Sequence, residues 1–490
     1  MRTKCWLICW ILLIMICFSA VAAGVYHVDP YFHYHKPHTD TYYYTLYNER
    51  AQNNGICRHF KYDAVITGTS LSENFRTSEM DRLFGCNTIK VCFQGGTYKE
   101  INDNLAVALK ANTDLKTVVR CLDLDKLIEP ADYMRTDLGR YPTYLYDRDP
   151  LNDAEYVLNW NIFSHVAAQV IEQIVPDGKE AGIDSFDDYY CWQKQPECYF
   201  GKNAICPDGV SAAVPAEQLY LTEEERTLIK ENITQNVTSL ADEYPDVVFY
   251  YYFSPYSVMK WVEALNGGTL ARRIEAEKLA AGLILQHENI CLFSFNTRPE
   301  IVIDLNNYMD FYHYGIWINS LILKWLHDGS CRLTKDNYEE YFREEYEFYL
   351  DFDYESLNSQ EDYEADYYAG ALLNNELTGA EPLDLLASGS IEKTLEGGRI
   401  TVDLSNGHNY LMYTVSENAR QADPAVFVFD ESGRPVGDEG NSIPPKDGNI
   451  HMHVIDLSTV NGPVTIVFNG VFCEKPENSD NNVFYGVMLY

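Results

Sequence analysis

The chain is poor in positive charge. Its 490 residues include 37 Lys and Arg against 73 Asp and Glu, a formal net charge of −36 with neutral histidines. Phosphate binding needs clustered Lys and Arg, so nucleic acid is excluded as the main partner, and an anionic membrane surface would repel the chain. Hydrophobic residues are nevertheless 46% and aromatics 14%. This composition excludes a mostly disordered chain and is sufficient for two or three domains.

Long apolar runs are almost absent. The one exception is Cys5–Ala23, and its 19 residues are close to the roughly 20 that span a bilayer as a helix. Positive charge precedes this run and none follows closely, which predicts a single span with the rest of the chain on the extracytoplasmic side. The alternative is a cleaved signal peptide, because Ala20-Val21-Ala22 is a small-x-small site. We therefore expect residues 1–24 to be a membrane anchor or a signal peptide, and the remainder to be membrane-tethered or secreted.

Cysteines spaced for zinc are also missing. Cys191, Cys198 and Cys206 share one polar loop, but their spacings of seven and eight residues do not match CxxC-type zinc sites. An extracytoplasmic compartment permits a disulfide in this loop, although one sequence does not give the pairing.

What the chain does have is a regular alternation of apolar runs and helical patterns that begins at residue 62, after an irregular aromatic stretch, within an expected α/β domain of residues 25–335. Such continuous apolar strands alternating with helices predict a parallel sheet covered on both faces. Residues 176–220 lack periodicity and look like an insertion. The expected strands are 62–67, 88–93, 116–122, 246–253 and 289–295, and the expected helices include 73–84, 98–110, 155–175, 257–286 and 316–326.

The last third of the chain follows another pattern. Residues 336–384 form an acidic, aromatic, helical connector, within which 336–366 hold 13 acids and one base. Residues 385–490 contain short alternating runs and turns, which predict an all-β sandwich. The sandwich is either a glycan-binding module or a structural or protein-contact domain. Its lack of tryptophan favours the second, because all seven tryptophans lie before residue 330.

A serine follows the first expected strand, in Gly68-Thr69-Ser70-Leu71. A hydroxyl placed there lies at the carboxyl edge of a parallel sheet, where open α/β sheets bind ligands. The following helix N-terminus can stabilise developing negative charge. Taken alone, Ser70 is better explained as a helix N-cap.

A carboxylate and a histidine follow the last expected parallel strand, in Asp310-Phe311-Tyr312-His313. An imidazole can take a hydroxyl proton, and a carboxylate can fix its tautomer and stabilise the imidazolium. Each motif alone is weak evidence for a catalytic site, but Ser70, Asp310 and His313 in this order along the chain are informative together.

These blocks resemble the SGNH/GDSL hydrolase superfamily. More narrowly, the stretches YDAVITGTSLSENF, YYYFSPYSVMKW and NNYMDFYHYGIWIN look like a bacterial, membrane-anchored SGNH-like surface family, over roughly residues 26–330. The resemblance implies a flavodoxin-like three-layer α/β domain in front of the β-sandwich. It also implies a nucleophile in Ser70, a general base in His313 and an orienting carboxylate in Asp310, with no metal or cofactor.

The resemblance further implies an oxyanion hole built from backbone N–H groups. These are the N–H of Ser70 and one from the Gly95-Gly96 pair, with Gly96 preferred. The family's third block supplies an Asn side chain, but Asp123 stands in its place here. An ionised Asp cannot donate a hydrogen bond. Either Asp123 is protonated, another donor serves, or the activity is low.

Three further residues are candidates for substrate binding. Tyr256 and Trp261 follow a strand end, where they either border the site or start a helix with core aromatics. Asn74 lies one turn beyond Ser70 and is either a substitute donor or a surface residue.

Together these features predict a cell-surface serine esterase or O-acyltransferase acting on an envelope or extracellular polysaccharide. The expected partners are an acylated carbohydrate or envelope polymer and, for a transferase, a membrane-bound acyltransferase. The alternative is a non-catalytic surface protein that keeps the SGNH scaffold for binding or assembly, which the missing Asn favours.

Overall fold

The structure is a computed structural model of the chain. It describes residues 2–137, 141–147, 149, 151–172, 180–194, 200–360, 383–386, 388–393, 397–408, 410–416, 425–431, 433, 436, 438–439, 450–457, 460, 462–472 and 482–490. Cys198 and Cys473 lie outside these residues, as do residues 361–382 of the expected connector.

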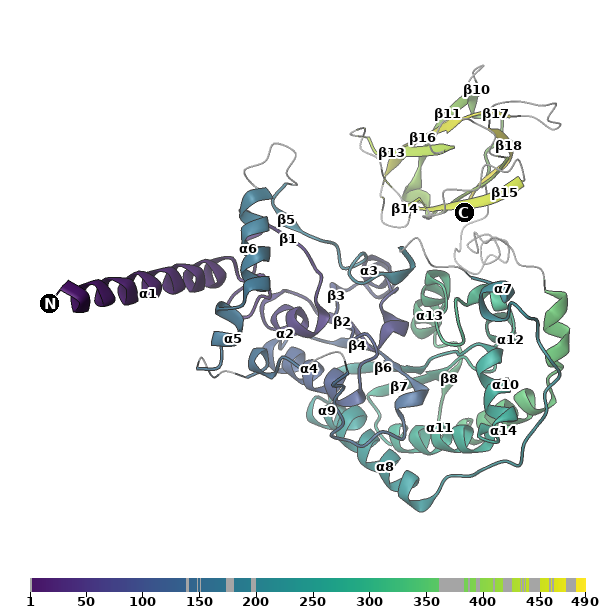
Figure 1. The fold of residues 1–490 in the computed structure, drawn as a ribbon. Helices are drawn as coiled ribbons and strands as arrows, with labels where there is room; N and C mark the ends of the chain where they lie inside the picture. The colour runs from purple at the N-terminus through teal and green to yellow at the C-terminus, as the bar shows by residue number, and fades with distance from the viewer. Residues whose placement is uncertain are drawn as a thin grey trace.

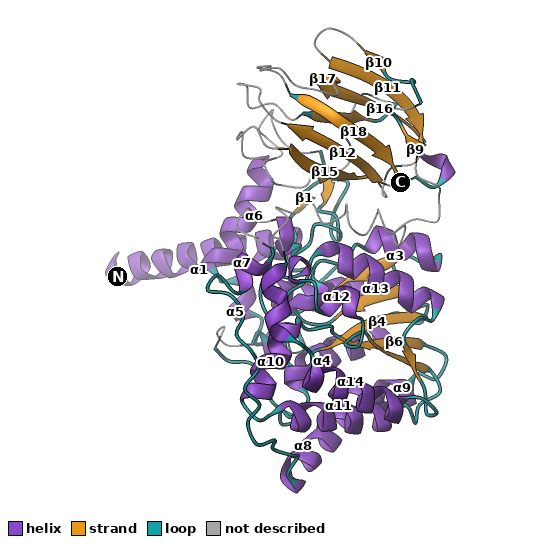
Figure 2. Cartoon of the chain, turned by 90° about the vertical axis from the view of Figure 1, so that its right-hand side faces the viewer, coloured by secondary structure: helices purple, strands orange, loops and turns teal. Residues whose placement is uncertain are grey.

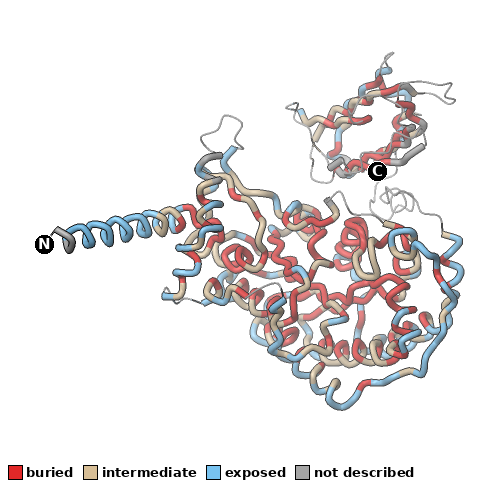
Figure 3. Tube along the Cα trace, in the orientation of Figure 1, coloured by how far each residue is buried: buried red, intermediate tan, exposed pale blue. Residues whose placement is uncertain are grey.

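The chain begins with a helix that stands away from the rest of the molecule. α1 (Arg2–Val28) is exposed over most of its length and becomes buried only near its end, at Val25 and Val28 (Figures 1 and 3). Its segment Cys5–Val28 is long and apolar enough to cross a membrane, by length and composition, as a signal sequence would also be.

A six-stranded sheet lies at the centre of the first domain. In sequence order, its five parallel strands are arranged 2-1-3-4-5, which is the order of flavodoxin-like doubly wound sheets. A short antiparallel strand, β8, closes the edge beside β7. The strands are β2 (Ala64–Thr67), β3 (Thr88–Lys90), β4 (Thr117–Leu122), β6 (Val248–Phe253), β7 (Ile290–Ser294) and β8 (Arg332–Leu333).

Helices cover both faces of this sheet, as the continuous apolar strands require. On one side α3 packs against α13, and on the other α4, α8 and α11 form a contiguous layer that α14 extends (Figure 1). Figure 3 shows the buried core concentrated between these layers. The helices are α2 (Glu49–His59), α3 (Thr77–Phe84), α4 (Tyr98–Ala111), α8 (Glu223–Ile233), α9 (Ser239–Glu243), α10 (Val258–Asn266), α11 (Leu270–Ile284), α12 (Pro299–Val302) and α13 (Ile316–Asp328).

Two expected helices are divided in the structure. The pattern over 257–286 forms α10 and α11 because Gly267 and Gly268 interrupt it, and Gly268 has a positive φ of 70°. The pattern over 155–175 is divided at Leu158–Asn159 into α5 (Ala154–Val157) and α6 (Trp160–Glu172). Hydrophobic periodicity continues across both breaks, so the sequence pattern did not reveal them.

The expected connector starts as part of the first domain. α14 (Tyr338–Asp351) packs on α11 and α10, with Phe342, Glu345 and Tyr349 buried and most of its other acids exposed. The Tyr349 ring stacks on Trp261, with centroids 4.5 Å apart. The acidic stretch is therefore a covering helix of the α/β domain over residues 338–351.

The C-terminal part contains two mainly antiparallel sheets, separate from the parallel one (Figure 2). They enclose their own apolar cluster, which includes Leu411, Ile466 and Phe484. Their principal strands are β11 (Gly397–Asp403), β12 (Tyr410–Ser416), β13 (Val426–Phe429), β15 (Ile450–Asp456), β16 (Pro463–Asn469) and β18 (Val483–Leu489). The shorter ones are β9 (Leu383–Asp384), β10 (Glu392–Lys393), β14 (Asp438–Glu439) and β17 (Val471–Phe472).

Candidate active site

A glycine sets the turn that presents Ser70. β2 ends at Thr67, and Gly68 follows with a φ of 150°, which L side chains rarely adopt. A Cβ at this position would lie 2.4 Å from the Ser72 Oγ and 2.8 Å from the Cys121 Cβ. The chain then turns into a short 3₁₀ helix, η1 (Ser70–Ser72), so that Ser70 stands at the carboxyl edge of the sheet.

Ser70, His313 and Asp310 form a chain of hydrogen bonds. The Ser70 Oγ lies 2.9 Å from the His313 Nε2, and the His313 Nδ1 lies 2.7 Å from the Asp310 Oδ2. Because the carboxylate can only accept, Nδ1 carries the proton and Nε2 is free to accept from the serine hydroxyl. The other Asp310 oxygen accepts from the backbone N–H groups of Tyr312 and His313, both at 2.8 Å. These bonds fix the carboxylate and, through it, the imidazole ring.

Hydrogen bonds and nearby charges shift the pKa values of His313 and Asp310 in the direction that base catalysis needs. Burial alone lowers the pKa of His313, but the hydrogen bond and charge of Asp310 outweigh it, and the net pKa is raised above 6.5. The charges of Glu73 and Asp123 act in the same direction. Burial raises the pKa of Asp310, but its bonds to His313 bring the net value below 3.8. Asp310 therefore stays ionised and favours the imidazolium.

The candidate oxyanion donors lie on adjacent strand ends. The Phe93 N–H donates to the Gly68 carbonyl at 2.9 Å, which holds the Gly95-Gly96 turn beside the Ser70 turn. The Gly96 N–H is engaged in a 2.7 Å bond to the Phe93 carbonyl. Among the described residues, the N–H groups of Ser70 and Gly95 have no acceptor. Gly95 is therefore the better candidate donor of this pair, because the Gly96 N–H is already hydrogen-bonded within the turn.

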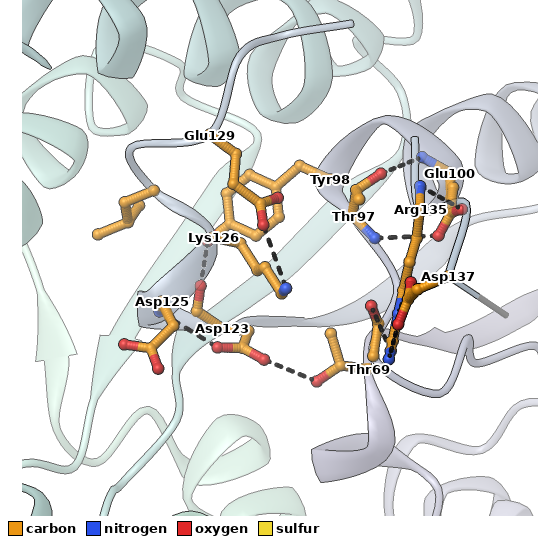
Figure 4. Close-up of polar contacts among 12 residues, drawn as sticks. Thr69, Thr97, Tyr98, Glu100, Asp123, Asp125, Lys126, Glu129, Arg135 and Asp137 are labelled. Atoms are coloured by element: carbon orange, nitrogen blue, oxygen red, sulfur yellow. Dashed lines mark hydrogen bonds and ion pairs between the residues drawn. The ribbon is translucent and has the colours of Figure 1, made fainter. Parts of the chain in front are cut away.

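Asp123 occupies the expected third position but acts as an acceptor. Its Oδ2 accepts from the Thr69 hydroxyl at 3.3 Å, and its Oδ1 accepts from the Asp125 N–H at 3.2 Å (Figure 4). A very short bond from the Tyr256 hydroxyl also reaches Oδ1. Burial raises the pKa of Asp123, while the hydrogen bond from Tyr256 opposes this effect. All three partners donate to Asp123, so the carboxylate has the role of an anchor rather than of an oxyanion donor.

Two ion pairs lie beside Asp123. Figure 4 shows Lys126 paired with Glu129 and Arg135 paired with Asp137, with nitrogen–oxygen distances of 3.1 and 2.7 Å. The Arg135 guanidinium also lies 3.3 Å from the carbonyl oxygen of Gly95 and fills the space that a Cβ there would need. The conformation of this turn, with a Gly95 φ of 57°, therefore depends on glycine.

The predicted substrate-binding residues are not all at the site. Tyr256 is, since it contacts Asp123 and its ring packs edge-on against Tyr312, with centroids 5.0 Å apart. Trp261 is not, because it is 1% exposed and packs in the core against α14. Asn74 is also buried, and its Oδ1 accepts from the Gln193 N–H at 3.3 Å. Asn74 thus supports a neighbouring segment rather than the reacting groups.

That segment contains a residue that the sequence analysis missed. Trp192 donates its Nε1–H to the Ser70 carbonyl at 2.9 Å, and its ring stands edge-on to the His313 ring with centroids 5.4 Å apart. Phe200 stacks on Trp192 and also contacts Trp317. Trp192 lies in the aperiodic insertion, where the aromatic run near Cys191 was the only available signal. These rings form an aromatic wall beside the Ser70–His313 pair.

A buried pair of acids lies behind the Ser70 turn. Glu49 is 4% exposed and Glu73 is 1% exposed, and neither carboxyl oxygen of Glu73 has a hydrogen-bond partner among the described residues. Burial raises the pKa of Glu73 to about 7, and burial followed by the charge of Glu73 raises that of Glu49 far above 4.5. Burial of two neighbouring carboxyl groups disfavours the ionisation of both at once. The Glu73 N–H donates to the Ser70 carbonyl at 3.2 Å, and the buried Lys90 Nζ donates to the Glu73 carbonyl, so the pair is built into the turn.

No protein-family model matches the chain, and no curated protein matches it. Among solved structures, a two-domain esterase active on acetylated mannans aligns with 87% of this chain and 91% of its own. That alignment has 11% identity and a TM-score of 0.24. These values are too low to assign a family or an activity, so the chemistry must follow from the site itself.

Proposed function

We propose that this protein is an SGNH-type serine esterase or O-acyltransferase. The observation that carries the proposal is the hydrogen-bonded order Ser70–His313–Asp310, with Oγ–Nε2 and Nδ1–Oδ2 distances of 2.9 and 2.7 Å. The sheet order and the position of Ser70 at its carboxyl edge support the same assignment.

The first half of the reaction forms an acyl-enzyme. The Ser70 Oγ attacks the ester carbonyl carbon while the His313 Nε2 takes its proton, and Asp310 stabilises the resulting imidazolium. The carbonyl oxygen becomes an oxyanion, which the N–H groups of Ser70 and Gly95 are placed to hold. Each such donor contributes about 3–4 kcal/mol to the transition state. The imidazolium then protonates the departing alkoxide as the tetrahedral intermediate collapses.

The second half resolves the acyl-serine. Neutral His313 takes a proton from water in an esterase, or from an acceptor hydroxyl in a transferase, and that oxygen attacks the acyl carbon. Collapse of the second intermediate returns the proton to the Ser70 Oγ. The same residues serve both outcomes, since only the oxygen that enters differs.

The proposed substrate is an acylated carbohydrate of the envelope or of an extracellular polysaccharide. Its support is the resemblance of the Ser70 and Asp310–His313 blocks and the apolar α1, which favours work on the extracytoplasmic side. A membrane-bound acyltransferase is the partner proposed for the transferase form.

One observation favours a second candidate, a non-catalytic surface protein that keeps this scaffold for binding. Asp123 fills the third donor position with an acceptor of three hydrogen bonds. Losing one oxyanion donor costs roughly 10²–10³ in rate, so catalysis would be slow but not absent.

Covalent labelling decides between the two candidates. We expect a fluorophosphonate probe to add to the Ser70 Oγ of the wild-type protein, and Ser70→Ala to abolish the adduct. Ser72→Ala is the matched control, since Ser72 lies two residues away and is fully buried against Tyr252. A folded wild-type protein that never labels, or labels equally after Ser70→Ala, would support the binding role instead.

A further inference from the structure

A surface helix near the base of α1 exposes a row of apolar side chains. In α6, Trp160 is 75% exposed and contacts the half-buried Phe163 with their rings tilted and their centroids 5.7 Å apart. Val170 is exposed on the same face, at spacings of three and seven residues along the row. Ile162 is buried on the side of the helix opposite Trp160, and Val166 is buried one turn away from both Phe163 and Val170. The row therefore lies along the border of the buried side of α6, with Trp160 as its most exposed member.

The surroundings of this row are apolar and uncharged. Leu151 and Leu158, just before α6, are 86% and 47% exposed. The sixteen residues between Glu155 and Glu172 contain no Asp, Glu, Lys or Arg. In a chain with a net charge of −36, such a stretch on the surface needs an explanation other than solubility.

Buried hydrogen bonds fix this region to the end of α1. The Tyr156 hydroxyl of α5 donates to the carboxylate of Asp29, which follows α1, at 2.7 Å. The Tyr156 hydroxyl oxygen also accepts from the Tyr31 N–H at 3.1 Å. Asp153 accepts from the Tyr34 hydroxyl at 3.0 Å and lies 3.2 Å from the His33 Nε2. These contacts fix α5 and the turn before it to the end of α1, and α6 itself packs against α1.

The two helices run crosswise to each other. In both Figure 1 and Figure 2, α1 projects from the domain and α6 crosses beside its base. A helix that enters a bilayer along its normal, as α1 is built to do, would place a crossing helix at its base in the plane of the membrane surface. Trp and Phe prefer that interface, where an apolar ring meets both lipid and water.

We propose that α6 and the turn before it are an interfacial membrane-contact surface, with Trp160, Phe163 and Leu158 inserted among the headgroups of the outer leaflet. The partner is a lipid surface that is not strongly anionic, since the chain carries excess negative charge. The proposal rests on the retention of α1 as an anchor, and not on the catalytic role of Ser70. Its consequence is that the catalytic domain is held at a set orientation on the membrane instead of swinging on a tether.

Photocrosslinking in the full chain tests this surface. The photoreactive residue p-benzoylphenylalanine replaces Trp160 in protein reconstituted into phosphatidylcholine vesicles, and lipid adducts are measured by mass spectrometry after irradiation. Tyr220 is the matched control, an aromatic residue 62% exposed near the start of α8. Ile14 of α1 reports separately on the anchor, and Leu158 provides a second position on the proposed surface.

We expect lipid adducts from positions 14, 158 and 160 and at least tenfold fewer from position 220. Adducts at 14 without adducts at 158 and 160 would overturn the proposal while leaving α1 as an anchor. Equal yields at 160 and 220 would overturn it as well, and so would a crosslink from 160 to another protein chain in place of lipid. No adduct at 14 would remove its basis, because α1 would then not lie in the bilayer.

Discussion

The Ser70 Oγ and the His313 Nε2 lie 2.9 Å apart although 243 residues separate them in the chain. The two groups meet because β2 is an inner strand of a parallel sheet, and the segment after β7 returns to the same carboxyl edge. The Tyr314 hydroxyl secures this return by donating to the Leu71 carbonyl at 3.2 Å. The pair is thus a product of the topology, and its chemistry can be tested by small changes around it.

Asp310→Asn should slow the reaction and move its pH dependence. An amide at this position favours the wrong His313 tautomer, so we expect kcat to fall on the order of 10³–10⁴-fold. In the wild type, activity falls as pH drops through the pKa of His313, which Asp310 raises above 6.5. Without that charge the acidic limb of kcat/KM should move to lower pH. Asp304→Asn, a change of another half-buried Asp whose carboxylate is bonded to Asn306, should leave the limb in place. An unmoved limb in Asp310→Asn would contradict the role given to Asp310.

Trp192→Phe should slow the formation of the acyl-enzyme while keeping an aromatic ring beside His313. The substitution deletes the donor to the Ser70 carbonyl and keeps a ring against His313. A lost hydrogen bond of this kind costs about 1 kcal/mol, so we expect roughly a fivefold slower rate of probe labelling. Trp317→Phe is the control, because it also loses a buried indole bond, to Asn307, but leaves Ser70 untouched. Equal slowing in both variants would assign the effect to general loosening.

The sequence predicted those parts of the molecule that local patterns determine. Strands such as 248–253 are continuous apolar runs, and the Ser70 and Asp310–His313 blocks are short motifs that follow strands. A prediction of their meeting needed only the rule that parallel strands share a carboxyl edge. The sheet order and the hydrogen-bonded chain agree with that expectation.

Features that depend on tertiary contacts were not predictable in this way. Trp192 reaches Ser70 because Asn74 accepts from the Gln193 backbone and the Gln193 side chain accepts from the Ile316 N–H, and no sequence period encodes those bonds. Which glycine offers a free N–H depends on the turn that engages Gly96. Trp261 follows a strand end, yet its ring turns to the core because α14 supplies Tyr349 as a stacking partner.

Asp123→Asn should raise activity. An Asn can keep its carbonyl oxygen towards Tyr256 and the Asp125 N–H and turn its amide towards Thr69. Its amide N–H would then supply a side-chain donor near the oxyanion, directly or by freeing the Thr69 hydroxyl. We expect about a tenfold or larger gain in kcat for a p-nitrophenyl ester. Asp125→Asn, a partly exposed neighbour paired with Arg273, should not change kcat, and a loss of activity in Asp123→Asn would mean that its charge is needed.

Replacing Glu73 or Glu49 by Gln should affect the pKa of His313 differently in the two variants. Glu73→Gln removes the carboxyl group whose charge acts on His313, whereas Glu49→Gln leaves that carboxyl group in place. The charge of Glu73 raises the pKa of His313. We therefore expect the acidic limb of kcat/KM to move to lower pH in Glu73→Gln and to stay or move higher in Glu49→Gln. Merely structural damage would not separate the two variants in sign.

The same pair gives a stability test that is independent of activity. The pKa of Glu73 is raised from 4.5 to about 7 in the folded protein by burial, so its proton favours the folded state. That stabilisation is complete below the unfolded pKa and is lost as pH rises through the folded one. The free energy of unfolding of the wild type should thus decline between pH 4.5 and about 7, and Glu73→Gln should flatten the decline. Denaturant titrations across this pH range measure the free energy of unfolding. The cations that act on the pair are Lys90 and Arg50, and its other titratable neighbours are His313, Cys92, Tyr189 and Tyr190. If the free energy of unfolding of Glu73→Gln declines as steeply with pH, the decline comes from a group other than Glu73.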